Sequence, residues 1–129
     1  MADLLAGMRI LILEDEFLIA MDLEQLCRDH GAAEIAIVND LSEIQPISTL
    51  PGFDAAILDV MLGGTSTLAF ARLLHQRKVP FIFSSGYTDL DQVFNTFPDI
   101  TVVSKPYAGS DLIRALAVAA GRLPASGGI

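Results

Sequence analysis

The sequence has a single cysteine, few basic residues and no long apolar run, and each shortage argues against a class of protein. Cys27 has no partner for an internal disulfide, which fits a reducing compartment. Lys and Arg number 8 against 16 Asp and Glu, so the net charge is −8 at pH 7. Because phosphate backbones and anionic lipids repel so acidic a chain, we expect no nucleic-acid or membrane partner.

The apolar runs are too short to cross a bilayer, which takes roughly 20 residues. Residues 1–7 lack the basic flank of a signal peptide, so we expect a cytoplasmic protein. With 129 residues, 52% of them hydrophobic, the chain can bury a substantial core. No linker or repeat divides it. We therefore expect one domain over 1–129, with a core at 8–122 and a flexible tail at 123–129.

Short runs rich in Ile, Val and Phe alternate with segments of helical spacing. The runs predict buried strands at Arg9–Leu13, Glu34–Val38, Ala55–Leu58, Phe81–Phe83 and Thr101–Val103. Helices are predicted around Ile19–Leu26, Leu41–Thr49, Leu68–Gln76, Leu90–Phe97 and Leu112–Ala119. Alternating strands and helices indicate parallel strands with right-handed crossovers, hence a doubly wound α/β sheet.

Polar side chains follow the predicted strands. They comprise Glu14-Asp15-Glu16 after the first strand, Asp59 after the third, Ser84-Ser85-Gly86 after the fourth and Ser104-Lys105-Pro106 after the fifth. Carboxyl ends of parallel strands meet at one edge of the sheet, where ligands bind in open α/β folds. Each group also has an ordinary explanation, as helix-terminus acids, a turn aspartate, loop hydroxyls or a solvated lysine. Those explanations do not account for all four falling on one edge.

Together these groups suit phosphoryl transfer to a carboxylate. Asp59 is the candidate nucleophile, which would form an aspartyl phosphate. Glu14 and Asp15 are candidate Mg²⁺ ligands with Asp59 and a backbone carbonyl, because Mg²⁺ prefers oxygen donors. The metal would offset the repulsion between Asp59 and the incoming phosphoryl oxygens. Lys105 would add a positive charge, and Ser85 a hydrogen bond, to the same oxygens.

The order and spacing of these motifs resemble those of the bacterial response-regulator receiver family, from Met8 to Arg122. The motifs are Leu13-Glu14-Asp15-Glu16, Leu58-Asp59-Val60, Phe83-Ser84-Ser85-Gly86-Tyr87 and Lys105-Pro106-Tyr107. The resemblance implies a flavodoxin-like fold with a five-stranded parallel sheet, strand order 2-1-3-4-5 and five helices. It also implies Mg²⁺ and phosphoryl transfer from a histidine kinase or a histidine phosphotransfer protein.

Residue by residue, the resemblance assigns Asp59 as the phosphoacceptor and Glu14 and Asp15 as the acidic pair. It assigns the backbone carbonyl of Met61 as a further Mg²⁺ ligand and Lys105 as the lysine that contacts the phosphoryl group.

At the fourth strand the resemblance selects Ser85, rather than Ser84, as the switch hydroxyl, because the small Gly86 follows it. The bond to Pro106 is cis in many receivers. Val102 stands where the family usually has an aromatic residue that swings inward on activation, so a switch of that kind is not expected.

The run Pro80–Gly86 resembles the FAT GUY subgroup, mostly stand-alone receivers of alphaproteobacteria, which also lack the aromatic switch. Partners in that subgroup resemble kinases of the HWE or a related class and phosphorelay components. Bulky Met61 and Tyr87 would flank the path of water to the phosphoryl group, which predicts a fairly long-lived aspartyl phosphate.

We expect a phosphoacceptor that signals by phosphorylation-dependent protein binding and catalyses only its own phosphorylation and slow dephosphorylation. A pseudo-receiver, binding proteins without phosphorylation, is the alternative. A haloacid-dehalogenase-like phosphatase is less favoured, since Glu14-Asp15-Glu16 lacks the Asp-x-Asp motif.

Two helices offer candidate partner surfaces. Leu18 and Met21 fall off the apolar stripe of the first helix and either contact the phosphoryl donor or fill the helix–sheet edge. In the last helix, four apolar residues either form an apolar outer face or pack closely inside, namely Ile113, Ala117, Val118 and Ala120. We accordingly expect a monomer, or a weak homodimer through the face built from 90–97, 101–103 and 112–119.

Overall fold

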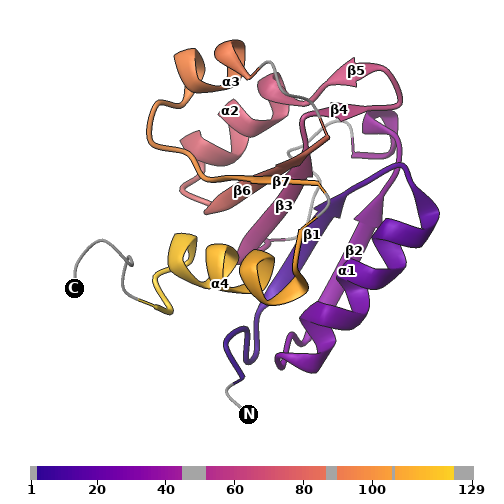
Figure 1. Ribbon diagram of the computed structural model, residues 1–129, viewed down its shortest axis with the longest axis vertical. Helices are drawn as coiled ribbons and strands as arrows, with labels where there is room; N and C mark the ends of the chain where they lie inside the picture. Colours follow the sequence, from indigo (N-terminus) through magenta and orange to yellow (C-terminus); the bar gives the residue numbers. More distant parts are fainter. Residues whose placement is uncertain (1–2, 45–51, 87–89, 106, 124–129) are drawn as a thin grey trace.

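A five-stranded parallel sheet forms the middle layer of the computed structural model, which describes residues 3–44, 52–86, 90–105 and 107–123 (Figure 1). Its strands are β1 (Arg9–Leu13), β2 (Glu34–Val38), β3 (Ala55–Asp59), β6 (Phe81–Ser85) and β7 (Val102–Ser104). They lie in the order β2-β1-β3-β6-β7, and all neighbours are parallel. Counted along the chain this is 2-1-3-4-5, so the predicted doubly wound topology is confirmed.

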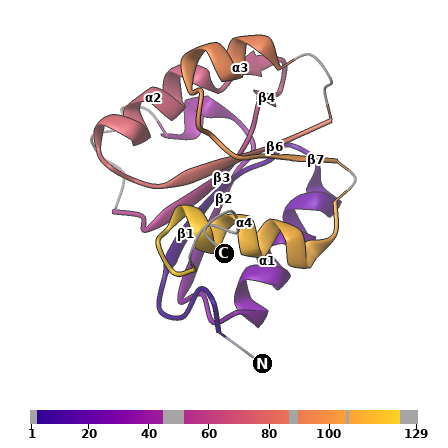
Figure 2. The same cartoon turned by 60° about the vertical axis from the view of Figure 1, so that its left-hand side comes forward.

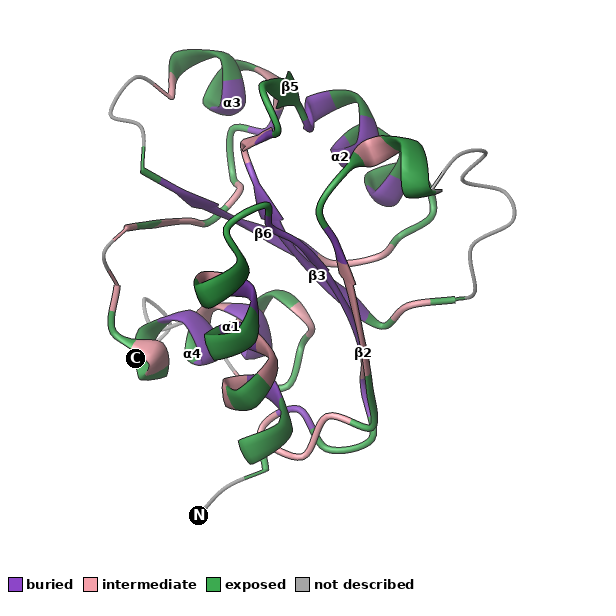
Figure 3. Ribbon diagram, turned by 90° about the vertical axis from the view of Figure 1, so that its right-hand side faces the viewer, coloured by how far each residue is buried: buried purple, intermediate pink, exposed green. Residues whose placement is uncertain are grey.

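Helices cover both faces of this sheet (Figures 1 and 2). One face packs against α1 (Phe17–Asp29) and α4 (Gly109–Ala119), and the other against α2 (Leu68–Gln76) and α3 (Asp91–Thr96). Side chains alternate between the two faces along each strand. The two resulting cores explain why the strands are mainly apolar, and β3 and β6 are buried along their whole length (Figure 3).

The prediction of five helices was wrong within the described residues, which form four α-helices and a short 3-10 helix, η1 (Leu41–Ile44). Side chains compete for backbone groups at this turn. Glu43 Oε1 accepts hydrogen bonds from the backbone N of Asn39 and Asp40, and Asp40 Oδ1 accepts one from Ser42 N. Residues 45–49 of the predicted helix lie outside the described residues, as do 124–129 of the predicted tail.

A two-stranded antiparallel hairpin, not predicted from the sequence, follows β3. It pairs β4 (Met61–Leu62) with β5 (Thr65–Ser66) through Gly63 and Gly64, whose φ angles are 57° and 83°. Positive φ is accessible to glycine at little cost, which makes the tight turn feasible. Thr67 then ties the hairpin to the sheet, since its Oγ1 donates to Asp59 O (2.6 Å) and Val60 O (3.0 Å).

The two helices that carried predicted partner surfaces differ. On α1, Leu18 is 76% exposed and Met21 48% exposed, so they do not fill the helix–sheet edge, and the neighbouring Phe17 is 71% exposed. On α4, Ile113 and Ala117 are buried and pack against the sheet, whereas Val118 and Ala120 are half-buried. None of the helices among the described residues has the length and apolar content to cross a membrane.

Candidate functional site

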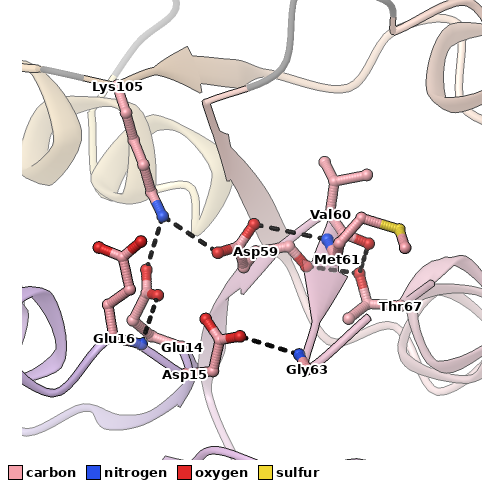
Figure 4. Close-up of polar contacts among 9 residues, drawn as sticks. All are labelled: Glu14, Asp15, Glu16, Asp59, Val60, Met61, Gly63, Thr67 and Lys105. Carbon is pink, nitrogen blue, oxygen red and sulfur yellow. Dashed lines mark hydrogen bonds and ion pairs between the residues drawn. The ribbon is translucent and has the colours of Figure 1, made fainter. Parts of the chain in front are cut away.

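Three charged side chains from different strands meet at the carboxyl edge of the sheet (Figure 4). Glu14 directly follows β1, Asp59 is the last residue of β3, and Lys105 directly follows β7. The ammonium Nζ of Lys105 donates to Glu14 Oε1 at 2.9 Å and to Asp59 Oδ2 at 3.0 Å. Residues 91 positions apart in the chain therefore share one ion cluster, as their places at the ends of parallel strands predicted.

This cluster is largely withdrawn from solvent. The side chain of Glu14 is 0% exposed, that of Asp59 9% and that of Lys105 17%. Buried charges are expensive unless they are paired, so the two carboxylates depend on the single ammonium between them. A second donor helps on one side, because the backbone N of Glu16 donates to Glu14 Oε2 at 3.0 Å.

Two pKa values in the cluster are shifted, for different reasons. Burial raises the pKa of Glu14, and the hydrogen bonds from Lys105 and the Glu16 backbone oppose this only in part. Burial also acts to lower the pKa of Lys105, but the hydrogen bonds and charges of Glu14 and Asp59 outweigh it. The net pKa of Lys105 lies above its ordinary value, so the lysine stays cationic at neutral pH.

Asp15 adds an exposed carboxylate to the same edge. Its Oδ2 accepts a hydrogen bond from the backbone N of Gly63 at 2.9 Å, which aims it toward the hairpin (Figure 4). Carboxylate oxygens of Glu14, Asp15 and Asp59 lie within 4.8 Å of one another, a group that could hold a metal ion. Three oxygen donors suit a hard divalent cation such as Mg²⁺. The backbone N of Met61 lies 3.4 Å from Asp59 Oδ1, which keeps this residue beside the same group.

Two serines end β6, and the structure distinguishes them. In the sheet register, Ser84 pairs with Asp59, so both side chains belong to the face that also carries Glu14 and Lys105. Ser84 is 1% exposed, and its Oγ has no hydrogen-bond partner among the described residues. Ser85, the residue selected from the motif, is equally buried, and its backbone O accepts from Lys105 N at 2.8 Å.

Sequence reasoning set Ser84 aside in favour of Ser85, and it gave no site role to Thr67 or Gly63. The two-residue alternation of a strand could have assigned Ser84 to the face of Asp59. No sequence pattern pointed to Thr67 or Gly63, because their contacts with Asp59 and Asp15 depend on how the hairpin folds back on the sheet. The expectations for Tyr87 and for the Pro106 peptide bond lie outside the described residues.

Comparisons with known proteins show which family this chain belongs to. The receiver domain of the PhyR response regulator from Erythrobacter litoralis is 26% identical, with a TM-score of 0.69 over 93% of this chain and 95% of its own. SdrG from Sphingomonas melonis Fr1 is 36% identical, with a TM-score of 0.74 over 92% of this chain and 98% of its own. The chain belongs to the response-regulator receiver family.

The receiver chain also has curated relatives. It is 29% identical over 124 residues to the transcriptional regulatory protein PdtaR of Mycobacterium tuberculosis. The matched stretch covers 94% of this chain and 60% of PdtaR. This receiver thus spans about 60% of the length of the curated relatives it matches. No family model matches the sequence.

The packing of Val102, where the resemblance led us to expect no aromatic switch, can be described. Val102 lies in β7, paired with Phe83 and packed against the core beneath α2 and α3. This partly buried aliphatic side chain has no ring to swing between an outer and an inner position.

Proposed function

We propose that this receiver is a phosphoacceptor that carries a phosphoryl group on Asp59, with Mg²⁺ bound beside it. The observation that carries the proposal is the contact of one buried ammonium, Lys105, with both Asp59 and Glu14 while Asp15 faces the same point. A lysine held against two carboxylates is already placed to follow an anion that becomes attached to one of them.

In the proposed step, a carboxylate oxygen of Asp59 attacks phosphorus. The new O–P bond forms while the P–N bond of a donor phosphohistidine breaks, and the imidazole keeps the electron pair and takes up a proton from water. Glu14, Asp15 and Asp59, with the backbone carbonyl of Met61, would hold the Mg²⁺. When bound, the cation neutralises charge on the phosphoryl oxygens and so reduces their repulsion from Asp59.

The protein's own residues provide orientation and charge in this step. Thr67 fixes the backbone at the end of β3 through its hydrogen bond to Asp59 O, so the nucleophile is held on a rigid strand. Lys105 exchanges its bond to Asp59 for one to a phosphoryl oxygen. Ser85, at the end of the adjacent strand, donates to another phosphoryl oxygen once the group has been transferred.

Intact-mass analysis after incubation with acetyl phosphate tests the proposal, with Mg²⁺ or with EDTA. We expect one Mg²⁺-dependent phosphoryl adduct on the wild type and none on Asp59→Asn. Asp54→Asn is the matched control, because this exposed aspartate precedes the same strand, and it should be modified as fully as the wild type. Adduct formation on Asp59→Asn, or none on the wild type, would contradict the proposal and favour a phosphorylation-independent binding module.

We also propose that α1 contacts the protein that donates the phosphoryl group, a histidine kinase or a histidine phosphotransfer protein. Phe17, Leu18 and Met21 form an exposed apolar group at the start of the helix, directly after the acidic residues of the site. An apolar group so close to a charged site suits a partner that must bring its histidine to Asp59.

Leu18→Gln should slow phosphoryl transfer from such a donor protein at least several-fold without slowing modification by acetyl phosphate. Phe94→Gln is the matched control, since this exposed aromatic lies on α3. Equal transfer rates for both variants and the wild type would rule out α1 as the docking helix.

A further inference from the structure

The structure contains a second hydroxyl at the phosphoacceptor, that of Ser84, which differs from the Ser85 hydroxyl of the family motif. Ser84 lies directly across from Asp59 in the register of β3 and β6, and across from Val103 on the other side. Val103 packs into the core beneath α1 and α4, which places Ser84 on that face of the sheet.

Lys105 extends along the same edge of the sheet. Its side chain starts at the end of β7, yet its Nζ reaches Asp59 on β3 and Glu14 beside β1. Since β6 lies between β7 and β3, the lysine side chain passes the carboxyl end of β6, close to Ser84 in the sequence. Ser84 is only 1% exposed although it stands near the end of a strand.

The hydroxyl of Ser84 is unpaired in this state of the site. Its Oγ is buried and has no hydrogen-bond partner among the described residues. By contrast, the hydroxyl of Thr67, which is also buried, bonds the backbone O of Asp59 and of Val60. A buried hydroxyl without a partner destabilises the state in which it occurs, and replacing it by an apolar group of the same shape can be neutral or favourable. A partner that is present only in another state would remove this cost there.

Phosphorylation would create that partner. In the resting site Asp59 Oδ2 accepts from Lys105. When phosphorus bonds to Oδ1 of Asp59 and Lys105 moves to the phosphoryl group, Oδ2 loses this donor while it remains buried, and a bound Mg²⁺ would occupy only one of its two lone pairs. The hydroxyl of Ser84, on the neighbouring strand and the same face, can rotate to donate to it.

We propose that Ser84 Oγ donates a hydrogen bond to the free carbonyl oxygen of phosphorylated Asp59 and so stabilises the phosphorylated form selectively. This inference rests on the proposed phosphoacceptor function. It implies that the two states respond oppositely to removal of the hydroxyl. The resting protein loses an unpaired polar group, and the phosphorylated protein loses a hydrogen bond.

The test compares Ser84→Ala with the wild type in both states. Urea unfolding without Mg²⁺ reports on the resting state, and fluorine NMR titration with beryllofluoride and Mg²⁺ reports on a phosphoryl mimic attached to Asp59. We expect an unchanged or higher urea midpoint together with a ~2- to ~10-fold weaker affinity for beryllofluoride, as for one net hydrogen bond. Ser104→Ala, an exposed serine at the end of β7, is the matched control and should change neither.

The outcomes separate this inference from the function beneath it. Equal beryllofluoride affinity for Ser84→Ala and the wild type would overturn the inference alone, and so would a lower urea midpoint, which would show that the hydroxyl is already paired at rest. A wild type that binds no beryllofluoride would overturn the proposed phosphoacceptor function, and this inference with it.

Discussion

An aspartate flanks each end of β3, and the two aspartates have opposite surroundings. Asp54, just before the strand, is exposed, and its Oδ2 accepts a hydrogen bond from the backbone N of Arg9 at 2.8 Å. Asp59, at the other end, is 6% exposed and shares Lys105 with a second buried carboxylate. Asp54 therefore links β1 to β3 by a hydrogen bond at the surface, whereas Asp59 is a buried charge.

The same contrast holds for the ion pairs at the two edges of the sheet. At the amino edge, Arg9 and Glu34 lie 3.4 Å apart with side chains 40% and 69% exposed. At the carboxyl edge, Lys105 and Glu14 lie 2.9 Å apart with side chains 17% and 0% exposed. Exposed pairs contribute little to stability, and buried ones are costly to assemble. The buried ion pair therefore lies at the carboxyl edge, where assembling it costs free energy of folding. Buried charges of this kind are typical of functional sites.

The largest expected effect comes from removing the cation at each edge in turn. Lys105→Met leaves two buried carboxylates without their shared partner, so we expect a loss of about 3 kcal/mol in the free energy of unfolding. Arg9→Met removes an exposed pair and should change it by less than about 1 kcal/mol. Urea unfolding at pH 7 without Mg²⁺ measures both. Similar losses for the two variants would remove the contrast between the edges.

Magnesium should stabilise the folded protein through the carboxyl edge of the sheet alone. Binding to the folded state stabilises it by about 1.4 kcal/mol when free Mg²⁺ is tenfold above its dissociation constant. Asp15→Asn removes one of the three clustered carboxylates and should weaken this gain, while Asp54→Asn should keep all of it. Thermal unfolding across a Mg²⁺ titration provides the measurement. A gain that survives Asp15→Asn unchanged would place the cation elsewhere.

A smaller effect is expected from pH, and its sign follows from the raised pKa of Glu14. Because the folded-state pKa lies above the unfolded one, this group stabilises fully below the unfolded pKa and loses that contribution as pH rises through the folded pKa. Lowering the pH from 7 toward 4.5 without Mg²⁺ should therefore favour the wild type relative to Glu14→Gln. Glu34→Gln, at the exposed edge, serves as the control in the same urea series. A difference between wild type and Glu14→Gln that stays constant with pH would contradict the shift.

The sheet could be predicted from the sequence because its strands are buried on both faces. Continuous runs such as Ile10 to Leu13 can hardly lie elsewhere, and parallel strands then bring Glu14, Asp59 and Lys105 to one edge. The strands β3 and β6 extend beyond their apolar runs to Asp59 and Ser85, since the hydrogen-bond ladder continues through polar residues.

Features that depend on tertiary contacts could not be predicted. The β4–β5 hairpin has only two residues per strand and is held by Thr67 and by the bond from Gly63 to Asp15. The candidate outer face of the last helix was undecided for the same reason, because only packing showed that Ile113 and Ala117 are buried. The unpaired hydroxyl of Ser84 became visible only with its neighbours in place.

Chemical trapping of the acyl phosphate tests the central claim most directly. The protein would be incubated with acetyl phosphate and Mg²⁺, reduced with borohydride, digested and sequenced by mass spectrometry. Borohydride converts a phosphorylated aspartate to homoserine, and we expect this conversion at Asp59 alone. Conversion at Asp15 or Asp54, or none at any aspartate, would contradict the assignment of the buried carboxyl edge as the phosphoacceptor site.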